Sequence, residues 1–327
     1  MARQKTMTIL IVILLFLFLA LLLYGASLTV GGLRKLTATT HAGVFAISAV
    51  LLGLATSFPE LSVAIKSGLS GNSALSLGNI LGANIANLTL VAGSAALIAG
   101  KIKVEGSSMI REIIATFLAG LAPLLFLLDG QISGLEGIIL IAFWVGYVLH
   151  FFHFRFARHA QVVQEEKKWH RFIHQKNLRQ MEGEVIHLLI GIALMVAAAE
   201  VVVRLAIFLS TSLGISLFVI GVIILAIGTT LSELIFSFRS ILAGESKMLL
   251  GNIMGAIVAN STLVVGVAAL FSPIVTPFAT SLMIGLIFIL AYLLFWYFIG
   301  ATHEINRFEG GVLLLLYLIF ILVVVVR

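Results

Sequence analysis

The sequence lacks cysteine altogether and carries little charge of either sign. None of its 327 residues is Cys, Asp occurs only once, and 10% of the residues are charged, whereas 61% are hydrophobic. The absence of Cys excludes disulfides and thiolate metal sites, and it leaves the redox compartment undetermined. A soluble domain carries about 25% charged residues, so the composition also excludes an ordinary water-soluble globule.

Long apolar runs take the place of the missing charge. Several approach the roughly 20 residues that a helix needs to cross a hydrocarbon core of about 30 Å. They lie at 8–23, 43–58, 184–203 and 310–326. A membrane barrel would instead show alternating segments of about ten residues. The first run is too long for the apolar part of a signal peptide, and no small-residue cleavage site follows it, so we expect a retained span.

Turn and charge signals divide the chain into ten candidate spans, so the expected fold class is an all-α polytopic membrane protein. The spans are roughly 7–30, 43–69, 74–99, 109–128, 134–153, 184–209, 214–240, 247–271, 278–299 and 308–326. A basic segment at 154–182 separates five spans from five. The expected organisation is a first half at 1–153, a basic linker at 154–183, amphipathic or irregular, and a second half at 184–327.

Lys and Arg residues are distributed unequally over the expected loops. With the 154–182 segment in the cytoplasm, 15 of the 20 Lys and Arg residues fall on the cytoplasmic side, in line with the positive-inside rule. Both termini then lie outside, although Arg3 and Lys5 oppose this orientation. Loop placement accounts for the net charge of +6, so no nucleic-acid partner is expected. The expected location is a plasma (inner) membrane with the linker in the cytoplasm.

One stretch of sequence occurs twice. Residues 53–93 and 226–266 align without a gap at an offset of 173 positions, with 19 identities in 41 positions. Such similarity between segments indicates an internal repeat. Because each half has an odd number of spans, the second copy must cross the membrane in the opposite sense. Inverted repeats of this kind are typical of secondary transporters, whose substrate site lies at mid-membrane between the two copies. The sequence therefore predicts ten membrane helices as two inverted five-helix repeats.

Each copy places a glutamate inside an apolar span. Counted along a helix, Glu60 and Asn87 lie about 18 and 22 Å from the same turn at Gly71, and thus near the middle of the membrane. Glu233 and Asn260 repeat this geometry in the second copy. The two glutamates are therefore expected to converge at the midplane from opposite halves.

These carboxylates have no counter-charge at their depth in the sequence. A charged carboxylate at a helix centre costs about 2.5–3.5 kcal/mol. Lys66 and Arg239 are nearer the helix ends and are expected to reach the headgroups. The simplest counter-charge is a bound cation, and a site of carboxylates, hydroxyls, amides and carbonyls suits hard ions such as Ca²⁺ or Na⁺. Pro59 is expected to free backbone carbonyls around Thr56, and Gly228 to supply the matching flexibility in the second copy.

Other polar residues are expected to be structural. Glu200 and Arg204 have the spacing of an i, i+4 ion pair, and Glu136 falls near a helix end, where it would be solvated or would cap the helix. Gly78 and Gly82 are expected to let helices approach closely. A histidine group in or beside the linker is expected to be a solvated basic face, with a metal or pH-sensing role as the alternative. It comprises His150, His153, His159, His170 and His174.

The two copies resemble the repeats of the calcium/cation antiporter superfamily, which includes the Na⁺/Ca²⁺ exchangers. Those repeats carry G-T-S-x-P-E followed by G-N-x-x-G-S-N-x-x-N/D, and the resemblance extends to the ten-span layout. It implies a secondary active antiporter that exchanges Ca²⁺ for Na⁺ by alternating access, and not an enzyme. It implies no cofactor, only the transported Ca²⁺ and Na⁺ (or H⁺), with inorganic cations and the lipid bilayer as partners. The oligomeric state stays open.

The resemblance also implies a set of metal-binding residues. They are Glu60, Glu233, Thr56, Thr229, Ser57, Thr230, Asn87 and Asn260. The two glutamates would supply carboxylates for Ca²⁺, and the threonine carbonyls at 56 and 229 would complete its shell. The hydroxyls at 57 and 230 would line flanking Na⁺ sites, and the two asparagines would occupy the central position. The first and sixth spans would slide across the rest.

The sequence departs from the superfamily pattern at three points. Ala83 and Ala256 stand where the superfamily has Ser, Ile257 corresponds to Asn84, and Asn260 takes a place that is often Asp. Two carboxylates balance one Ca²⁺ or two H⁺, whereas three Na⁺ would leave excess positive charge. An H⁺-coupled antiporter for Ca²⁺ or another divalent ion is therefore an alternative.

Two other classes of membrane protein are disfavoured. A cation channel could use the same oxygen ligands, but channels usually build their pore on an oligomer axis. An intramembrane hydrolase would need a Ser–His pair, two Asp residues or an H-E-x-x-H motif at depth. The single Asp is at position 129, and no His lies near the repeats.

Overall fold

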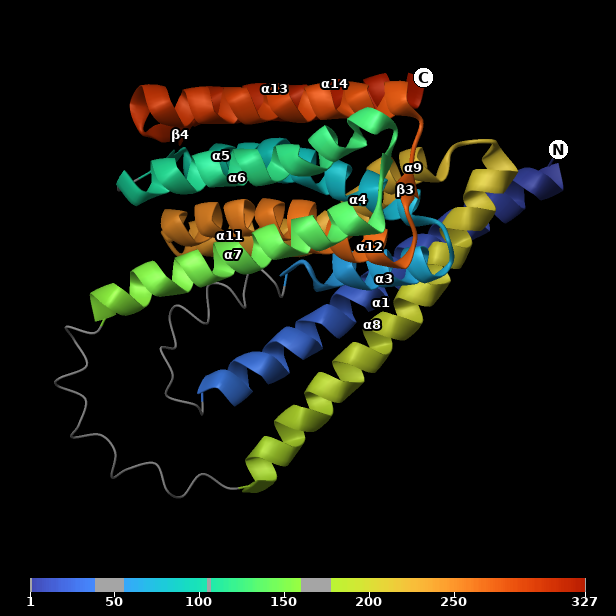
Figure 1. Cartoon of the computed structure of the whole chain (residues 1–327), viewed down its shortest axis with the longest axis horizontal. Helices are drawn as coiled ribbons and strands as arrows, with labels where there is room; N and C mark the ends of the chain where they lie inside the picture. Colours follow the sequence, from blue (N-terminus) through green and yellow to red (C-terminus); the bar gives the residue numbers. More distant parts are fainter. Residues whose placement is uncertain (1, 39–55, 105–106, 160–177, 327) are drawn as a thin grey trace.

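A computed structural model describes residues 2–38, 56–104, 107–159 and 178–326, and these are almost entirely helical (Figure 1). Within the described residues, eight helices are long and apolar enough to cross a membrane, and a shorter apolar helix lies at Gly134–His150. The predicted second span and the predicted linker are described only in part, because residues 43–55 and 160–177 lie outside the described residues. The protein is thus a multi-pass membrane protein.

The first half contains six α-helices among its described residues. Its elements are α1 (Ala2–Ala38), α3 (Phe58–Leu69), α4 (Ser73–Ala86), the π-helical turn η1 (Asn87–Val91), α5 (Ala92–Ala99), β1 (Lys101–Lys103), α6 (Ser107–Phe126), the 3₁₀ turn η2 (Leu127–Asp129), β2 (Gln131–Ile132) and α7 (Gly134–His159). Helix α7 runs six residues into the predicted linker, because the segment from 154 to 159 contains no Gly or Pro to end it.

The elements of the second half are α8 (Leu178–Leu213), α9 (Leu217–Ile220), the π-helical turn η4 (Gly221–Leu225), α10 (Ala226–Leu242), α11 (Ser246–Val258), the π-helical turn η5 (Ala259–Val264), α12 (Val265–Phe271), β3 (Ile274–Val275), α13 (Phe278–Thr302), β4 (Glu304–Asn306) and α14 (Arg307–Val326). From α3 and α10 onward, the second half has a closely similar succession of elements, without a counterpart of η2. Helix α8 also extends into the predicted linker, beginning at Leu178. The four short strands were not predicted from the sequence.

Helices α1 and α8 lie side by side and cross the remaining helices obliquely (Figure 1). They share an apolar cluster that includes Leu15 and Leu19 of α1 with Ala198 and Val202 of α8. Most of the other helices pack around a second, larger cluster. The apolar interior is therefore divided into two parts, and the α1/α8 pair has a core largely of its own.

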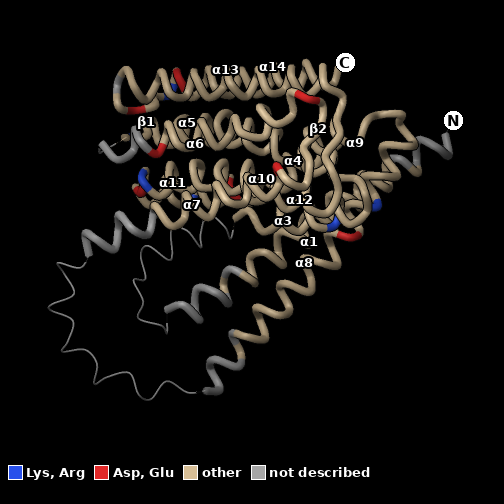
Figure 2. The backbone as a smooth tube through the Cα atoms, viewed as in Figure 1, with Lys and Arg blue, Asp and Glu red and all other residues tan. Residues whose placement is uncertain are grey.

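Two small antiparallel sheets join the halves at opposite ends of the bundle. Strand β1 pairs with β4, and β2 pairs with β3. Figure 1 shows β4 at the left end and β3 at the right, and Figure 2 shows β1 at the left and β2 at the right. At the repeat offset, β1 corresponds to β3 and β2 to β4. Corresponding strands thus lie at opposite ends, which we name the β1/β4 end and the β2/β3 end.

A matching pair of capping boxes starts α7 and α14. The backbone N–H of Ser133 donates to Glu136 Oε2 at 2.7 Å, and that of Asn306 donates to Glu309 Oε2 at 2.8 Å. The return bonds run from the N–H of each glutamate to the side-chain oxygen of its partner. These pairs occupy corresponding positions in the two halves, and the expectation that Glu136 caps a helix is confirmed.

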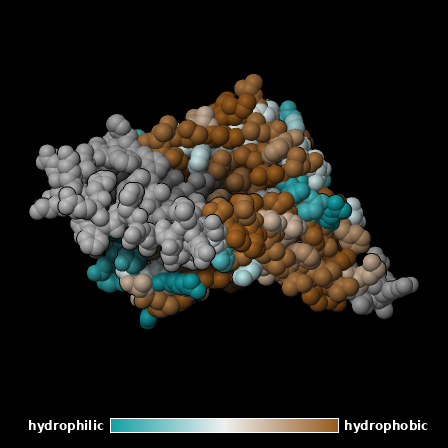
Figure 3. Space-filling view, turned by 90° about the horizontal axis from the view of Figure 1, so that it is seen from below, coloured by the Kyte–Doolittle hydropathy of each residue, from teal (hydrophilic) through white to brown (hydrophobic). Residues whose placement is uncertain are grey.

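The outer surface of the bundle suits a hydrocarbon surrounding. Large apolar side chains are widely exposed, as at Leu118, Leu125 and Leu286. Charged residues lie mostly near helix ends (Figure 2), and the described face seen in Figure 3 is mainly apolar, with hydrophilic residues in a few patches. An apolar surface of this extent is unusual for a soluble monomer and is the ordinary state of a membrane-spanning one.

An ion-pair network connects α8 to α3. Arg204 Nε lies 2.6 Å from Glu200 Oε1, which confirms the predicted i, i+4 pair, and Lys66 Nζ lies 2.9 Å from Glu200 Oε2. Lys66 was expected to extend to the headgroups. Its ammonium contacts Glu200 of α8, which packs against α3, and helix spacing within one span cannot reveal this contact.

The network predicts unequal effects of removing its members. Lys66→Met leaves Glu200 paired with Arg204, whereas Glu200→Gln leaves two cations without their carboxylate. Because unpaired charge is costly within a membrane, we expect Glu200→Gln to lower the melting temperature more than Lys66→Met does. Thermal unfolding of the purified variants in detergent, followed by Trp fluorescence, measures this. Glu245→Gln, at an exposed turn, is the control, and a larger fall for Lys66→Met would contradict the expectation.

Candidate cation-binding site

Two carboxylates are completely buried, one from each half. Glu60 and Glu233 are both 0% exposed. Among the described residues, neither oxygen of Glu60 has a hydrogen-bond partner, while Glu233 accepts one bond from the Ser232 hydroxyl at 2.8 Å and leaves Oε1 unpaired. The carboxylates are close enough to interact electrostatically. As anions they would therefore repel each other, and each would lack a cationic side chain in the described part of the protein.

Local sequence sets the position of Glu60. Pro59 lacks an N–H and is therefore favoured in the first turn of a helix. Helix α3 begins accordingly at Phe58 after Ser57, and Glu60 falls in its first turn. The positive end of a helix dipole favours a carboxylate there. The expected interruption of the helix at Pro59 thus agrees with the start of α3.

In the second copy, a different local structure positions Glu233. Helix α10 runs without a break through Gly228, and the irregular turn lies before it, in η4. The expectation that Gly228 supplies flexibility is wrong, since Ser232 stands where the first copy has proline and does not interrupt the helix. Gly228 instead makes room for α1, because a Cβ at this position would lie 2.5 Å from a methyl group of Leu19.

Two of the side-chain hydrogen bonds between the halves form a matching pair. Thr229 Oγ1 donates to Asn79 Oδ1 at 3.2 Å, and Thr56 Oγ1 donates to Asn252 Oδ1 at 3.4 Å. The two bonds correspond at the repeat offset, so each half supplies one threonine and one asparagine. Asn79 and Asn252 were not among the predicted site residues. Their identity in both copies of the Gly-Asn step was the signal that could have identified them.

The predicted central asparagines both lie in π-helical turns. Asn87 begins η1, and Asn260 is the second residue of η5. Such turns are frequent at functional sites, because they interrupt the regular i→i−4 bonding of a helix. Among described residues, both side-chain polar atoms of Asn87 are unpaired, and Asn260 leaves its Oδ1 unpaired. Asn260 Nδ2 donates to Asn84 Oδ1 at 3.3 Å, and Asn84 Nδ2 donates to Ser261 Oγ at 2.7 Å, which fixes the oxygen of Asn260 as the free atom.

The remaining predicted ligands are also buried. Ser57 and Thr230 are 1% and 2% exposed, and their hydroxyls have no hydrogen-bond partner among the described residues. The hydroxyls of Thr56 and Thr229 form the crossed bonds, and the carbonyl of Thr229, one of the predicted ligand atoms, also accepts a bond from the Ser232 hydroxyl at 2.9 Å. All eight predicted residues are thus buried, and six of them carry an unpaired side-chain atom.

Such a concentration of unpaired buried groups is uncommon in a folded protein. About 90% or more of buried polar groups normally have a partner, and a buried polar group without one costs about 1–3 kcal/mol. Most of the unpaired atoms here are oxygens, the ligand type preferred by Ca²⁺ and Na⁺. In the described part of the chain, no three His, Cys, Asp or Glu residues gather as a metal cluster. The arrangement can therefore hold a hard cation through two carboxylates and neutral oxygens.

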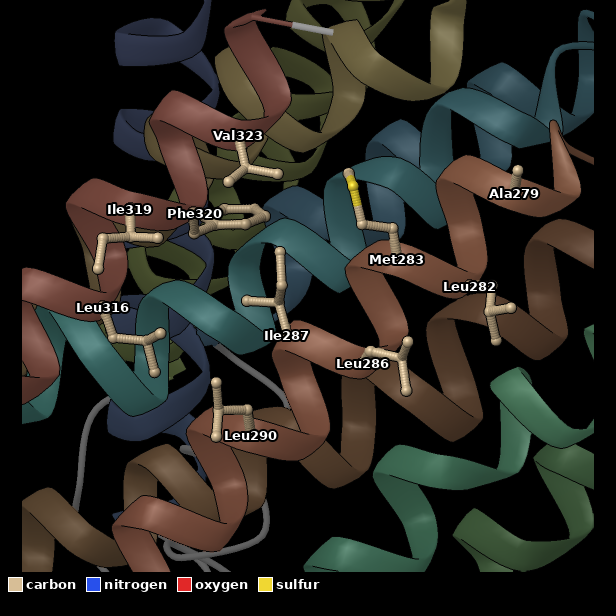
Figure 4. Close-up of a pocket in the computed structure, with 10 residues that line it drawn as sticks. All are labelled: Ala279, Leu282, Met283, Leu286, Ile287, Leu290, Leu316, Ile319, Phe320 and Val323. Carbon is tan, nitrogen blue, oxygen red and sulfur yellow. The ribbon is translucent and has the colours of Figure 1, made fainter.

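An apolar groove between α13 and α14 is a different kind of site (Figure 4). It has a volume of about 500 Å³. Its lining consists of Ala279, Leu282, Met283, Leu286, Ile287, Leu290, Leu316, Ile319, Phe320 and Val323. None of these side chains carries an oxygen ligand, so the groove is unsuited to a hard cation.

Comparison with known proteins identifies the family. The sodium/calcium exchanger protein family matches residues 10–153 and 184–326. The chain belongs to this family. The match includes both copies of the site and omits the segment between 154 and 183, which the sequence analysis assigned to the linker.

Several known proteins are similar to this chain over most of its length and most of their own. The chain is 28% identical to the putative antiporter CaxA of Alkalimonas amylolytica, over 91% of this chain and 93% of that protein. It is 26% identical to the sodium/calcium exchanger MaX1 of Methanosarcina acetivorans, over 85% and 88% of the two chains. A structure of the sodium–calcium exchanger NCX_Mj, soaked with Na⁺ and Ca²⁺, is similar with a TM-score of 0.62 and 25% identity, covering 96% of this chain and 98% of that one.

Proposed function

We propose that this exchanger-family protein is a secondary active antiporter that carries Ca²⁺ in exchange for Na⁺ across the membrane. One observation carries the proposal. Glu60 and Glu233 are fully buried, come from opposite halves, and have no cationic partner among the described residues. A bound Ca²⁺ would cancel both charges. The names of the relatives, an antiporter and two sodium/calcium exchangers, support the same function.

The proposed ligand roles combine the unpaired side-chain atoms with two backbone carbonyls. The carboxylates of Glu60 and Glu233 would bind Ca²⁺ directly, with the carbonyls of Thr56 and Thr229 beside them. The crossed threonine–asparagine bonds hold these backbone segments in place. The Ser57 and Thr230 hydroxyls would contribute to flanking Na⁺ positions, and the oxygens of the two asparagines in η1 and η5 would complete the centre. Each ligand pair thus draws one member from each half.

Coupling would follow from competition for the same carboxylates. When Ca²⁺ leaves, two adjacent negative charges remain in a low-dielectric interior, a state that costs several kcal/mol per ion. The protein would therefore change access only when Ca²⁺ or the counter-ions neutralise the site. Exchange, rather than one-way leakage, is the result.

Alternating access would use an inverted pair of five-helix repeats. The corresponding strands at opposite ends of the bundle, the matching capping boxes and the paired π-helical turns support this arrangement. The α1/α8 pair, with its separate apolar cluster, would be the moving element. The β1/β4 end carries Lys101, Lys103 and Arg307 and would face the cytoplasm of a plasma (inner) membrane, as would the 154–183 linker.

The charge of the site favours H⁺ as a second candidate counter-ion. Ala83 and Ala256 are buried and offer no hydroxyl, and Asn260 brings an amide rather than a third carboxylate. Two carboxylates can bind one Ca²⁺ or two H⁺ without excess charge. Three Na⁺ would leave a net positive site in the membrane interior, which is unfavourable.

Transport by purified protein in liposomes tests the proposal and separates the two counter-ions. We expect Ca²⁺ uptake to depend on an imposed Na⁺ gradient, and to be absent with Glu60→Gln. Uptake that responds only to a pH gradient would assign H⁺ as the counter-ion. Uptake by wild-type protein that is indifferent to both gradients would contradict antiport and favour a channel.

A further inference from the structure

Two more buried hydroxyls lack partners, and neither belongs to the predicted ligand set. Ser76 of α4 and Ser237 of α10 are both 0% exposed. Among the described residues, the Oγ atom of each has no hydrogen-bond partner. A buried hydroxyl without a partner is unfavourable by about 1–3 kcal/mol, so some group that can bind oxygen or hydroxyl is expected to meet each of them.

Helical spacing puts both hydroxyls on the faces that carry the site. Ser76 precedes Asn79 by three residues on α4, and Ser237 follows Glu233 by four residues on α10. Residues three or four apart share one face of a helix. Ser237 is also seven residues after Thr230, two turns along the same face. Each serine therefore extends a row of polar side chains by one turn.

The two rows extend toward opposite ends of the bundle. Helix α4 starts at Ser73, three residues before Ser76, and leads through η1 and α5 to β1, so it starts at the β2/β3 end. Ser73 at this start donates to the carbonyl of Ala268, near β3, at 3.1 Å. Helix α10 leads to α11, which contacts β1, so Ser237 lies on the side of the β1/β4 end. The serines thus flank the carboxylates on opposite sides.

The repeat breaks its symmetry at these two positions. The counterpart of Ser76 is Leu249, and the counterpart of Ser237 is Ala64. Both counterparts are apolar and 0% exposed. One turn beyond the site, a hydroxyl follows on α4 but not on α3 toward the β2/β3 end, and on α10 but not on α11 toward the β1/β4 end. At each end, therefore, one helix carries an unpaired buried hydroxyl one turn beyond the site, whereas the buried hydroxyl of Ser67 on α3 donates to the carbonyl of Ala64.

We propose that Ser76 and Ser237 are cation relay sites, one on each side of the paired glutamates. Each hydroxyl oxygen would replace one water of a Ca²⁺ or counter-ion that moves between Glu60/Glu233 and one face of the membrane. Ions would pass Ser76 on the outer side and Ser237 on the cytoplasmic side. The inference rests on the proposed antiport function and adds its two access routes.

The Cys-free sequence permits a direct test by single cysteines. Ser76→Cys and Ser237→Cys each introduce the sole thiol of the chain. Their matched controls are Leu249→Cys and Ala64→Cys at the corresponding positions of the other half. A charged, membrane-impermeant methanethiosulfonate is applied to intact cells and to inside-out vesicles. We expect Ser76→Cys to react from outside only and Ser237→Cys from the cytoplasmic side only, at least about tenfold faster than the control thiols.

Saturating Ca²⁺ should slow the reaction of both serine-derived thiols, because an occupied site limits access to its approaches. Reaction of both from the same face, or control thiols reacting equally fast, would overturn the relay assignment. If a cysteine variant fails to fold, Ser76→Ala and Ser237→Ala replace it. They should lower the maximal Ca²⁺ uptake rate about tenfold while changing the half-saturating Ca²⁺ concentration less than twofold, and unchanged rates would overturn the proposal.

The outcomes distinguish this inference from the function on which it rests. Gradient-driven uptake by the wild-type protein reports antiport alone and involves no cysteine. Normal wild-type exchange, together with unreactive thiols or with two thiols that react from the same face, would reject only the relay sites. Wild-type protein without exchange would reject the antiport mechanism, whatever the thiols do.

Discussion

Replacing Glu233 with Gln should reduce Ca²⁺ uptake to the level of protein-free liposomes. The substitution keeps the size of the side chain and removes one of the two buried charges. Removing one partner of a buried charge pair costs about 2–5 kcal/mol, which corresponds to a loss of Ca²⁺ affinity of about 30-fold or more. The folded protein should persist, because the variant also removes repulsion between two neighbouring carboxylates.

Ca²⁺-dependent stability gives a second measure of the same change. Ca²⁺ at about 100 times its dissociation constant should stabilise the wild-type protein by about 2.7 kcal/mol, and a loss of affinity of about 30-fold or more in Glu233→Gln should reduce this gain to about 0.9 kcal/mol or less. Glu309→Gln is the matched control, since Gln can also serve the capping box at the start of α14. Ca²⁺-driven stabilisation or uptake as large in Glu233→Gln as in the wild-type protein would remove this carboxylate from the site.

The second large effect is expected at Gly78, where two helix backbones touch. A Cβ at Gly78 would overlap the carbonyl oxygen of Phe218, and one at Gly221 would overlap that of Leu75. Neither backbone can yield as a flexible side chain could. Gly78→Ala should therefore destabilise the protein by more than the roughly 1–3 kcal/mol typical of overpacking, and most of the variant protein should aggregate. The expectation that this glycine lets helices approach closely agrees with the contact.

Size-exclusion chromatography and thermal unfolding in detergent measure this loss. Gly146→Ala on α7 is the control, because no described residue lies within 4 Å of a Cβ there and Ala is the better helix former. A Gly78→Ala variant that melts with the wild-type protein would show that α4 and η4 can separate without loss of the fold.

The candidate site residues could be predicted from the sequence because charged and polar side chains are unusual inside apolar spans. Glu60 and Glu233 are conspicuous inside apolar spans, and the exact offset of the repeat relates each to a partner. The crossed bonds of Thr56 and Thr229 were not predictable. They depend on which helices of the two halves face each other, and spacing along one helix does not contain that information.

Other features were missed for related physical reasons. The strands are two or three residues long, too short for the alternation that identifies a strand in sequence. The π-helical turns have no composition of their own. The pairing of Lys66 with Glu200 joins spans 134 positions apart, and Ser76 and Ser237 escape a search for repeats because each has an apolar counterpart.

The pairing of helices has a consequence for how the molecule unfolds. Helix α1 lies along α8, α5 along α14 and α12 along α7, and in every case one helix comes from each half. Both sheets likewise take one strand from each half. The two halves therefore pack against each other as the subunits of an intertwined dimer do, but within one polypeptide. Neither half has a complete apolar interior without the other. We therefore expect the two halves to unfold together, so that a substitution that destabilises one half also destabilises the other.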